Sequence, residues 1–431
     1  MKRGFYTIMA AQFFSSLADN ALLIAAIALL AELSGPQWVV PLLKFFFTVS
    51  YVILAPFVGA FADSMPKGRV MFITNALKIV GCIMLLFYQL LLVPGLPAFV
   101  IVLVAYAVVG LGAAAYSPAK YGILTELLPP QQLVFANGWI EGLTVASIIL
   151  GVLLGGALIS PAVSHVLIAI DITYIDTGID TPAEAAMPLI ALVYLAAAIF
   201  NLFIPDTGAH YEPQRTNPIL LARDFWTCFT TLWRDKLGQI TLAVTTLFWG
   251  AGATLQFLVL RWTERNLGLP LSQGAVLQGV TALGIALGAV FAARFVPLRR
   301  SLSVLPVGVA MGIAVMLMAY VSAMPLVYLM LIVVGALAGC FVVPMNALLQ
   351  HRGHVLLSAG HSIAVQNFNE NLAILAMLAI YSGMIATNLG VHAIMVIFGL
   401  FVAGTMVLVM LRHRYNQSRG DSLHLIGMEK H

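Results

Sequence analysis

Apolar runs long enough to cross a lipid bilayer follow one another between about residues 5 and 411. A membrane-spanning helix needs about 20 predominantly apolar residues. Twelve such runs lie near residues 5–31, 38–62, 70–92, 98–124, 132–160, 186–205, 238–262, 272–296, 302–323, 325–349, 358–387 and 391–411. With 61% apolar and 9% charged residues and a mean hydropathy of +1.00, the composition excludes a water-soluble globular protein. We therefore predict an all-α membrane protein with twelve transmembrane helices.

Basic residues fall on alternate connections between these spans, namely at Lys2, Arg3, Lys67, Arg69, Arg215 to Lys236, Arg299, Arg300, Arg352 and Arg412 to Lys430. Because Lys and Arg accumulate in cytoplasmic loops, both termini are predicted to be cytoplasmic. The loop at 161–186 carries four acidic residues and is expected to face outward, with at most a small β-hairpin. The net charge of +4 follows from this loop bias, so no nucleic-acid partner is expected.

One long polar stretch divides the spans into two groups of six. We expect an N-terminal six-helix bundle at 1–206, a cytoplasmic linker at 207–237, a C-terminal bundle at 238–414 and a tail at 415–431. In the linker, apolar residues recur at helical spacing at Ile219, Ala222, Trp226, Phe229 and Trp233. This pattern predicts an amphipathic helix that either lies in the membrane interface or packs beneath the bundles.

The two halves also share a short pattern. Asn137 and Glu141 in the fifth span correspond to Gln366 and Glu370 in the eleventh, because each pair places an amide four residues before a glutamate. The pattern predicts pseudo-symmetric halves with a binding site between them.

Charges inside the spans are the candidate site residues, since an ionised side chain at the bilayer centre costs roughly 2.5–3.5 kcal/mol on the insertion scale. They are Asp19, Lys78, Lys120, Glu141, Arg261 and Glu370. Asp19 could pair with Lys78 or Lys120 only to hold helices together, but buried charges in spans favour a functional role. The two glutamates could equally serve packing, and Arg261 could extend its side chain to the surface.

The connection between the second and third spans resembles the loop signature of the major facilitator superfamily, with Gly59, Asp63, Gly68 and Arg69 at the matching positions. Asp63 is expected to meet an arginine and the start of the next helix, which would stabilise one conformation. The alternative is a solvated hairpin. The predicted gating residues are Asp63, Lys67, Arg69, Lys78 and Asn346.

A closer resemblance covers almost the whole chain. It is carried by Ala18–Leu23 (ADNALL), Ala113–Leu124 (AAAYSPAKYGIL), Phe248–Gly252 (FWGAG), Val343–Gln350 (VPMNALLQ), Ala364–Asn367 (AVQN), Glu370 and Asn371. These segments resemble the bacterial lysophospholipid transporter family of the same superfamily. The resemblance implies a monomeric flippase without a cofactor. It would move lysophosphatidylethanolamine and lysophosphatidylglycerol from the outer to the cytoplasmic leaflet of the bacterial inner membrane, where an acyltransferase restores the second chain.

The charges fit a zwitterionic head group. A phosphate needs a cation, which Lys120 and secondarily Arg261 offer, and an ethanolamine ammonium needs a carboxylate, offered by Asp19, Glu141 or Glu370. Polar neighbours complete the predicted substrate-binding set, namely Asn20, Tyr116, Asn137, Gln256 and Asn367. Gln256 departs from the family, which has arginine there. Arg261 lies five residues later, about 140° around the helix, so it compensates only in part.

Two other functions remain open. A small-solute or drug proton antiporter would have the same fold and would use Asp19 or Glu141 as a proton carrier. A membrane acyltransferase is disfavoured because the nearest His–Asp pair, His165 and Asp171, is too widely spaced for such an enzyme. Three scattered cysteines give neither a disulfide framework nor a zinc site, so no metal is expected.

Overall fold

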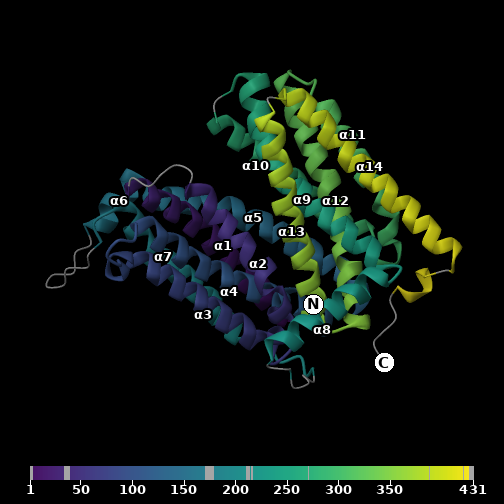
Figure 1. The fold of residues 1–431 in the computed structure, drawn as a ribbon, viewed down its shortest axis with the longest axis horizontal. Helices are drawn as coiled ribbons and strands as arrows, with labels where there is room; N and C mark the ends of the chain where they lie inside the picture. Colours follow the sequence, from purple (N-terminus) through teal and green to yellow (C-terminus); the bar gives the residue numbers. More distant parts are fainter. Residues whose placement is uncertain are drawn as a thin grey trace. The chain divides into compact units, whose positions relative to one another are not determined.

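The computed structural model describes residues 3–33, 39–169, 179–209, 214, 217–269, 271–387, 389–420 and 422–426. Across these residues the chain forms fourteen α-helices and a few 3-10 turns (Figure 1). Twelve helical segments are long and apolar enough to cross a membrane. They are α1 (Arg3–Glu32), α2 (Val40–Ala62), α3 (Lys67–Leu86), α4 (Ala98–Leu127), α5 (Leu133–Ile159), α7 (Pro182–Leu202), α9 (Gly238–Leu267), α10 (Leu271–Phe295), α11 (Leu305–Met318), α12 (Met324–Leu356), α13 (Ala359–Ala386) and α14 (Val391–Ser418). Each coincides with one predicted span, which confirms the prediction of twelve.

The loop at 161–186 opens with a short helix, α6 (Pro161–Ile168), which the sequence pattern did not predict. Pro161 supplies a preset φ at the first helical position. Residues 170–178, which hold most of the alternating pattern behind the expectation of at most a small hairpin, lie outside the described chain. α7 then starts at Pro182, and the N-cap residue Thr181 forms a capping box with Glu184 that satisfies backbone N–H groups at the helix start.

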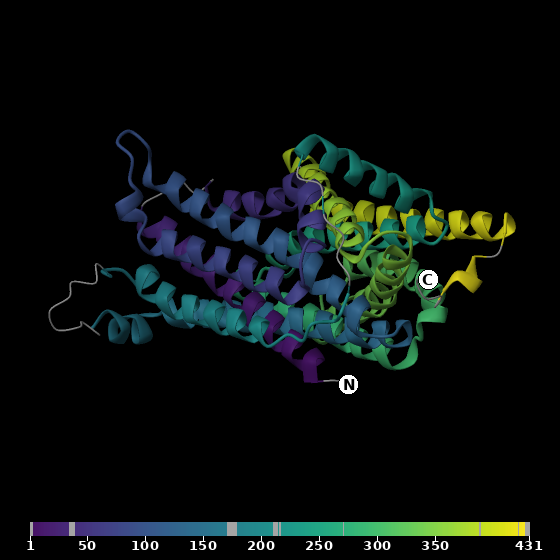
Figure 2. The ribbon, with the colours of Figure 1, turned by 90° about the horizontal axis from the view of Figure 1, so that it is seen from below.

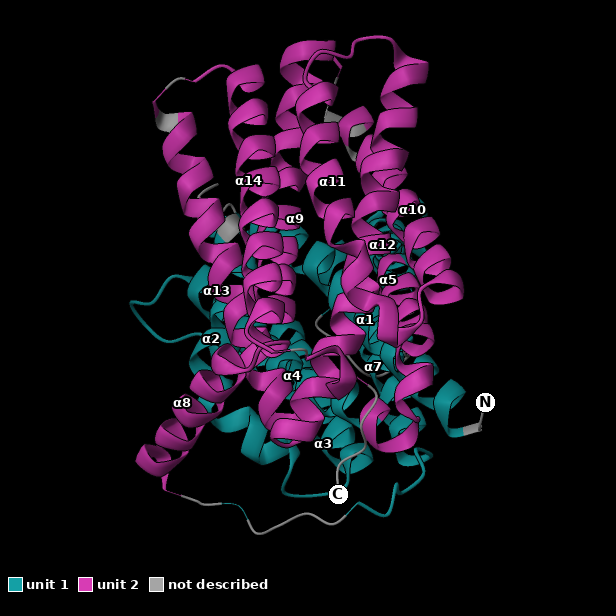
Figure 3. Cartoon of the chain, turned by 90° about the vertical axis from the view of Figure 1, so that its right-hand side faces the viewer, with its two compact units in different colours: residues 1–123, 146–216 teal, residues 124–145, 217–431 magenta. Residues whose placement is uncertain are grey.

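The described chain divides into two compact units (Figure 3). Unit 1 contains residues 1–123 and 146–216, and unit 2 contains residues 124–145 and 217–431. The division cuts through α5, whose first half belongs to unit 2 and whose second half belongs to unit 1. In unit 1, α7 packs against both α1 and α3, and in unit 2, α14 packs against α11 and α9 (Figure 2).

Small residues allow close helix contacts in unit 1. A methyl group at Gly151 of α5 would lie 2.6 Å from the carbonyl oxygen of Leu17, and one at Gly155 would lie 2.8 Å from that of Ala21. Both glycines therefore allow the α5 backbone to approach α1 closely, which is a common way for helices to associate in lipid.

In unit 2, α10 and α12 meet through glycines on both helices. A methyl group at Gly288 would overlap the carbonyl oxygen of Ala336, and one at Gly339 would overlap that of Ile285. A side chain at these positions forces the two backbones apart, because neither carbonyl can move without breaking helical hydrogen bonds.

Gly288→Ala should therefore destabilise the protein by about 1–3 kcal/mol through overpacking. Gly279→Ala, on the same helix with open space around it, is the matched control. Thermal unfolding of the detergent-solubilised variants measures the effect. Equal melting temperatures for the two variants would show that the α10–α12 contact is not as close as described.

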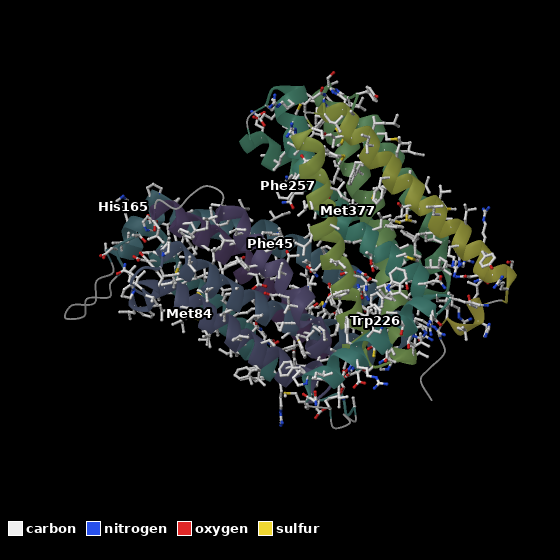
Figure 4. All side chains as sticks on the ribbon, viewed as in Figure 1. Phe45, Met84, His165, Trp226, Phe257 and Met377 are labelled. Atoms are coloured by element: carbon white, nitrogen blue, oxygen red, sulfur yellow. The ribbon has the colours of Figure 1, made fainter. Side chains whose placement is uncertain are left out.

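The linker forms the predicted amphipathic helix, α8 (Pro218–Arg234). One side packs on α13, where Phe225 and Phe229 contact Phe368 with ring centroids 5.5 Å and 6.1 Å apart. Ile219 is 78% exposed and Trp226 is 60% exposed. Figure 4 labels Trp226 on this helix. Packing against the bundle is thus confirmed for one side of α8, and contact of the other side with the membrane interface stays a prediction.

The end of the linker is tied to α12 by an ion pair. Arg352 donates from Nε and Nη2 to the two carboxylate oxygens of Asp235 at 2.9 Å and 2.7 Å. Asp235 also accepts hydrogen bonds from the backbone N–H groups of Leu237 and Gly238 at the start of α9. A single carboxylate therefore joins α8, α9 and α12 on the linker side of unit 2.

Candidate functional site

An ion pair between α1 and α3 lies at the centre of the first group of buried polar residues. Lys78 Nζ donates to Asp19 Oδ2 at 2.8 Å and to Ser15 Oγ at 3.0 Å. Tyr194 of α7 donates its hydroxyl to Asp19 Oδ1 at 2.7 Å. Both carboxylate oxygens thus have a donor. We call this group, with Asn75 and Tyr116, the Asp19 cluster.

Two further members of the Asp19 cluster surround the lysine and hold unused hydrogen-bond donors. The Tyr116 ring centroid lies 5.0 Å from Lys78 Nζ. Asn75 accepts a 2.7 Å hydrogen bond from Ser15 through Oδ1. Within the described chain, neither the buried Tyr116 hydroxyl nor the buried Asn75 amide nitrogen has a partner. Such donors in a low-dielectric interior are costly, so they mark a place where an acceptor can bind.

The two charges of the Asp19 cluster differ in exposure. The Lys78 side chain is 2% exposed and that of Asp19 is 18% exposed. The pair therefore does not form a completely enclosed salt bridge, because the carboxylate keeps one accessible side. Asn20, the next residue, is not part of this group, since its amide donates to the carbonyl oxygen of Ser16 on its own helix at 2.8 Å.

Lys120 lies on α4 one helical turn beyond Tyr116, toward the linker-side end of that helix. Residues four apart share a helix face, so Lys120 follows the Tyr116 side chain along α4. It is half-buried, and its Nζ lies 4.2 Å from the centre of the Tyr121 ring.

A second polar group joins the first half of α5 to α12 within unit 2. Asn137 and Gln350 exchange two amide hydrogen bonds, each 2.9 Å long. One turn away, Asn346 donates to Glu141 Oε1 at 3.2 Å. The two helices run in opposite directions here, so a spacing of four residues on each helix places both pairs in register. We call these four residues the α5–α12 ladder.

The ladder continues onto α13. Gln366 Nε2 donates to Asn346 Oδ1 at 3.0 Å and to Glu370 Oε1 at 2.7 Å. Two amides therefore separate the carboxylates of Glu141 and Glu370, and all four side chains are buried. The shared pattern of the two halves thus places both glutamates in one network.

Removing one amide of the reciprocal pair should leave its partner unsatisfied. We expect Gln350→Leu or Asn137→Leu to lower stability by about 1–3 kcal/mol each, because a buried amide loses its hydrogen bonds. The double variant should recover part of this loss. Thermal unfolding of the two single variants and the double variant gives the coupling. Fully additive effects would show that the pair does not act as a unit.

The remaining predicted site residues lie elsewhere. Gln256 is exposed on α9, where its backbone carbonyl accepts a 2.7 Å hydrogen bond from Gln278 of α10. Arg261 is half-buried and makes no hydrogen bond or salt bridge to any residue that the structure describes. Asn367 is buried on α13, directly after Gln366 in the chain.

The loop signature has a different cation from the expected one. Lys67 pairs with Asp63 at 2.5 Å and also donates to the carbonyl oxygen of Ala62 at 2.7 Å, while Arg69 is exposed. Arg69 as the partner of Asp63 is therefore wrong in this conformation. Lys67 is four residues after Asp63 and lies buried at the start of α3, so it reaches the carboxylate before Arg69 can.

Sequence reasoning missed four members of these networks, namely Ser15, Asn75, Tyr194 and Gln350. Three had a usable signal. Asn75 lies three residues before Lys78, on the same face of α3, Ser15 lies four residues before Asp19 on α1, and Gln350 lies four residues after Asn346 on α12. Tyr194 had none, because only the packing of α7 on α1 brings it to Asp19.

Among the residues that the structure describes, no three His, Cys, Asp or Glu side chains are placed to hold a metal ion. Twelve apolar helices with charged and amide networks on their buried faces are typical of a membrane transporter. Residues 8–376 match the family model of the Major Facilitator Superfamily.

Lysophospholipid transporters from Yersinia enterocolitica and Yersinia pestis are each 42% identical to this chain over 395 residues, which cover 91% of the chain and 90% of each relative. The chain belongs to the lysophospholipid transporter family of the Major Facilitator Superfamily, which confirms the resemblance seen in the sequence.

Solved structures support the fold. A bacterial homologue of the iron transporter ferroportin in an outward-facing state has a TM-score of 0.72 at 16% identity, covering 97% of this chain and all of that one. The Escherichia coli fucose:proton symporter has a TM-score of 0.67 at 13% identity, covering 96% of this chain and 98% of that one. At such low identity these structures establish the architecture and not the substrate.

Proposed function

We propose that this protein moves lysophospholipids, namely lysophosphatidylethanolamine and lysophosphatidylglycerol, from the outer to the cytoplasmic leaflet of a bacterial inner membrane. The observation that carries the proposal is the 42% identity, over nine tenths of the chain, to proteins named lysophospholipid transporters. The buried charges supply an independent reason, because both signs of charge occur in the spans.

The physical task limits what the protein must provide. Drawing one CH₂ out of hydrocarbon costs about 0.8 kcal/mol, so the acyl chain stays in an apolar environment and only the head group needs a polar path. Asp19 offers a partly accessible carboxylate for the ammonium. Lys120 offers a cation for the phosphate one turn nearer the linker side of α4, and Arg261 is the second candidate for that role.

The linker side is the cytoplasmic side in this proposal, because the basic connections of the sequence, including the linker, are expected to be cytoplasmic. A lysophospholipid delivered to that leaflet would be the substrate of an acyltransferase, which would restore the second chain. The transporter itself would act as a monomer without a cofactor.

Gating is assigned to two groups of residues. The α5–α12 ladder holds α5 against α12 on the linker side of unit 2, and Asn346 and Glu141 must separate for α5 to leave α12. Asp63, Lys67 and Arg69 form the second group, in which the carboxylate would exchange its lysine partner for another cation in a different conformation.

Reconstitution into proteoliposomes tests the proposal. Labelled lysophosphatidylethanolamine added outside should become resistant to extraction by albumin, and only in vesicles that contain the protein. A proton gradient is then imposed or collapsed in parallel samples that contain a drug substrate. No lysophospholipid uptake, combined with gradient-dependent drug export, would replace the proposed function by proton antiport.

A further inference from the structure

The ion pair of the Asp19 cluster is made of the two charges that complement a zwitterion. Lys78 would attract a phosphate, and Asp19 would attract an ammonium, yet in this conformation the two are bound to each other at 2.8 Å. Opening the pair without replacement would leave a buried ammonium uncompensated, which is strongly unfavourable.

Two unused donors for a phosphate lie in the same cluster as the lysine. The Tyr116 hydroxyl and the Asn75 amide nitrogen are buried donors without an acceptor among the described residues. A cation and neutral hydrogen-bond donors are the groups that bind an anion. Because no acceptor among the described residues uses the two donors, we interpret the cluster as an incomplete anion site.

An ammonium has a matching place beside the carboxylate. Lys78 Nζ lies 5.0 Å from the Tyr116 ring and 5.9 Å from the Tyr194 ring while it contacts Asp19. A ligand ammonium bound to Asp19 in place of Nζ would meet the same rings, and aromatic faces attract cations at this range. The 18% exposure of Asp19 gives the ligand a side from which to approach.

We propose that the Asp19–Lys78 ion pair is an exchange site for a zwitterionic phosphate–ammonium head group. The ammonium takes the place of Lys78 at Asp19, and the phosphate takes the place of Asp19 at Lys78. One ion pair becomes two and no charge is left uncompensated. A singly charged anionic head group would bind Lys78 and leave Asp19 without a cation, so the site prefers zwitterionic lysophospholipids. This inference rests on the proposed function and adds the residue pair that selects the head group.

A head-group competition tests the exchange. Proteoliposomes receive equal amounts of differently labelled lysophosphatidylethanolamine and lysophosphatidylglycerol. The measured quantity is the initial uptake rate of lysophosphatidylethanolamine divided by that of lysophosphatidylglycerol. Asp19→Asn leaves Lys78 without its acid, so the ratio should fall at least about tenfold toward the anionic lipid. Lys78→Met leaves a lone carboxylate, so the ratio should rise by a similar factor.

A structural ion pair predicts a different result, since breaking it from either end would slow both lipids by the same factor. Equal ratios in the wild type and both variants would therefore overturn the inference. Because each ratio is measured within one preparation, a loss of folded protein cancels. Arg352→Met, which breaks the Asp235 ion pair outside the cluster, is the control for lost stability and should keep the wild-type ratio.

If a single variant fails to fold, Asp19→Asn/Lys78→Met removes both charges together and leaves no buried charge unpaired. It should take up lysophosphatidylethanolamine at least about tenfold more slowly than the wild type. Wild-type uptake by this variant would also overturn the inference. If the wild-type protein transports neither lipid, the proposed function itself is wrong, which is a separate outcome.

Discussion

Replacing Asp19 by alanine should lower lysophospholipid uptake about tenfold to a hundredfold per folded protein. The substitution removes the carboxylate that we assign to the ammonium, and charge-assisted hydrogen bonds contribute about 1.5–3 kcal/mol each. It also leaves Lys78 buried without its acid, so the free energy of unfolding should fall by about 3–5 kcal/mol. Initial uptake rates in proteoliposomes, normalised to monodisperse protein, measure the first effect, and thermal unfolding measures the second.

Ser16→Ala provides the control on the same helix, because the structure gives the Ser16 side chain no role in the Asp19 cluster. It should retain wild-type uptake and stability. Wild-type uptake by Asp19→Ala would contradict the assignment. A large loss of stability together with normal uptake per folded protein would restrict Asp19 to a structural role.

Replacing Lys120 by alanine should lower uptake at least about tenfold, because the phosphate loses its cation on the linker side of the Asp19 cluster. Lys120→Arg keeps the charge and should retain a substantial part of the rate, although arginine presents a wider planar group. The same uptake assay measures both variants. Equal rates for the alanine and arginine variants would show that the charge at this position does not act on the head group.

The positions of the spans could be predicted from the sequence because length and hydropathy alone decide whether a segment crosses a bilayer. α8 could be predicted from its periodicity, since Trp226 and Phe229 recur at helical spacing. α6 could not, because its 8 residues are too few to show a helical period, although Pro161 favours a helix start.

The site could be predicted only as a set of charges. Asp19 and Lys78 could be identified as candidate site residues because they are charged residues inside apolar spans. Their pairing depends on how α1 and α3 are rotated about their axes. Apolar periodicity does not determine this rotation when most positions of a helix are apolar. The same limit applies to Arg69, which the loop signature suggested and Lys67 replaces. The network of Glu141 and Glu370 was visible as a repeat of amide and acid, but Gln350 becomes its partner only through the antiparallel contact of α5 and α12.

The division of α5 between the two units could not be read from hydropathy either, because the helix as a whole is apolar enough to read as one continuous span. Its first half joins α12 through Asn137 and Glu141, and its second half joins α1 through Gly151 and Gly155. Amides and acids in one half and glycines in the other explain this division, since each half contacts its neighbour through a different kind of interaction.

The central claim is that charges inside the spans guide a lipid head group through the protein. Photocrosslinking with a lysophosphatidylethanolamine that carries the reactive group on its head, followed by peptide mapping, tests it most directly. The account predicts labelled peptides from α1, α3 and α4 around Asp19, Lys78 and Lys120, and loss of this labelling in Asp19→Ala. Labelling confined to lipid-exposed positions, and unchanged in that variant, would contradict the account.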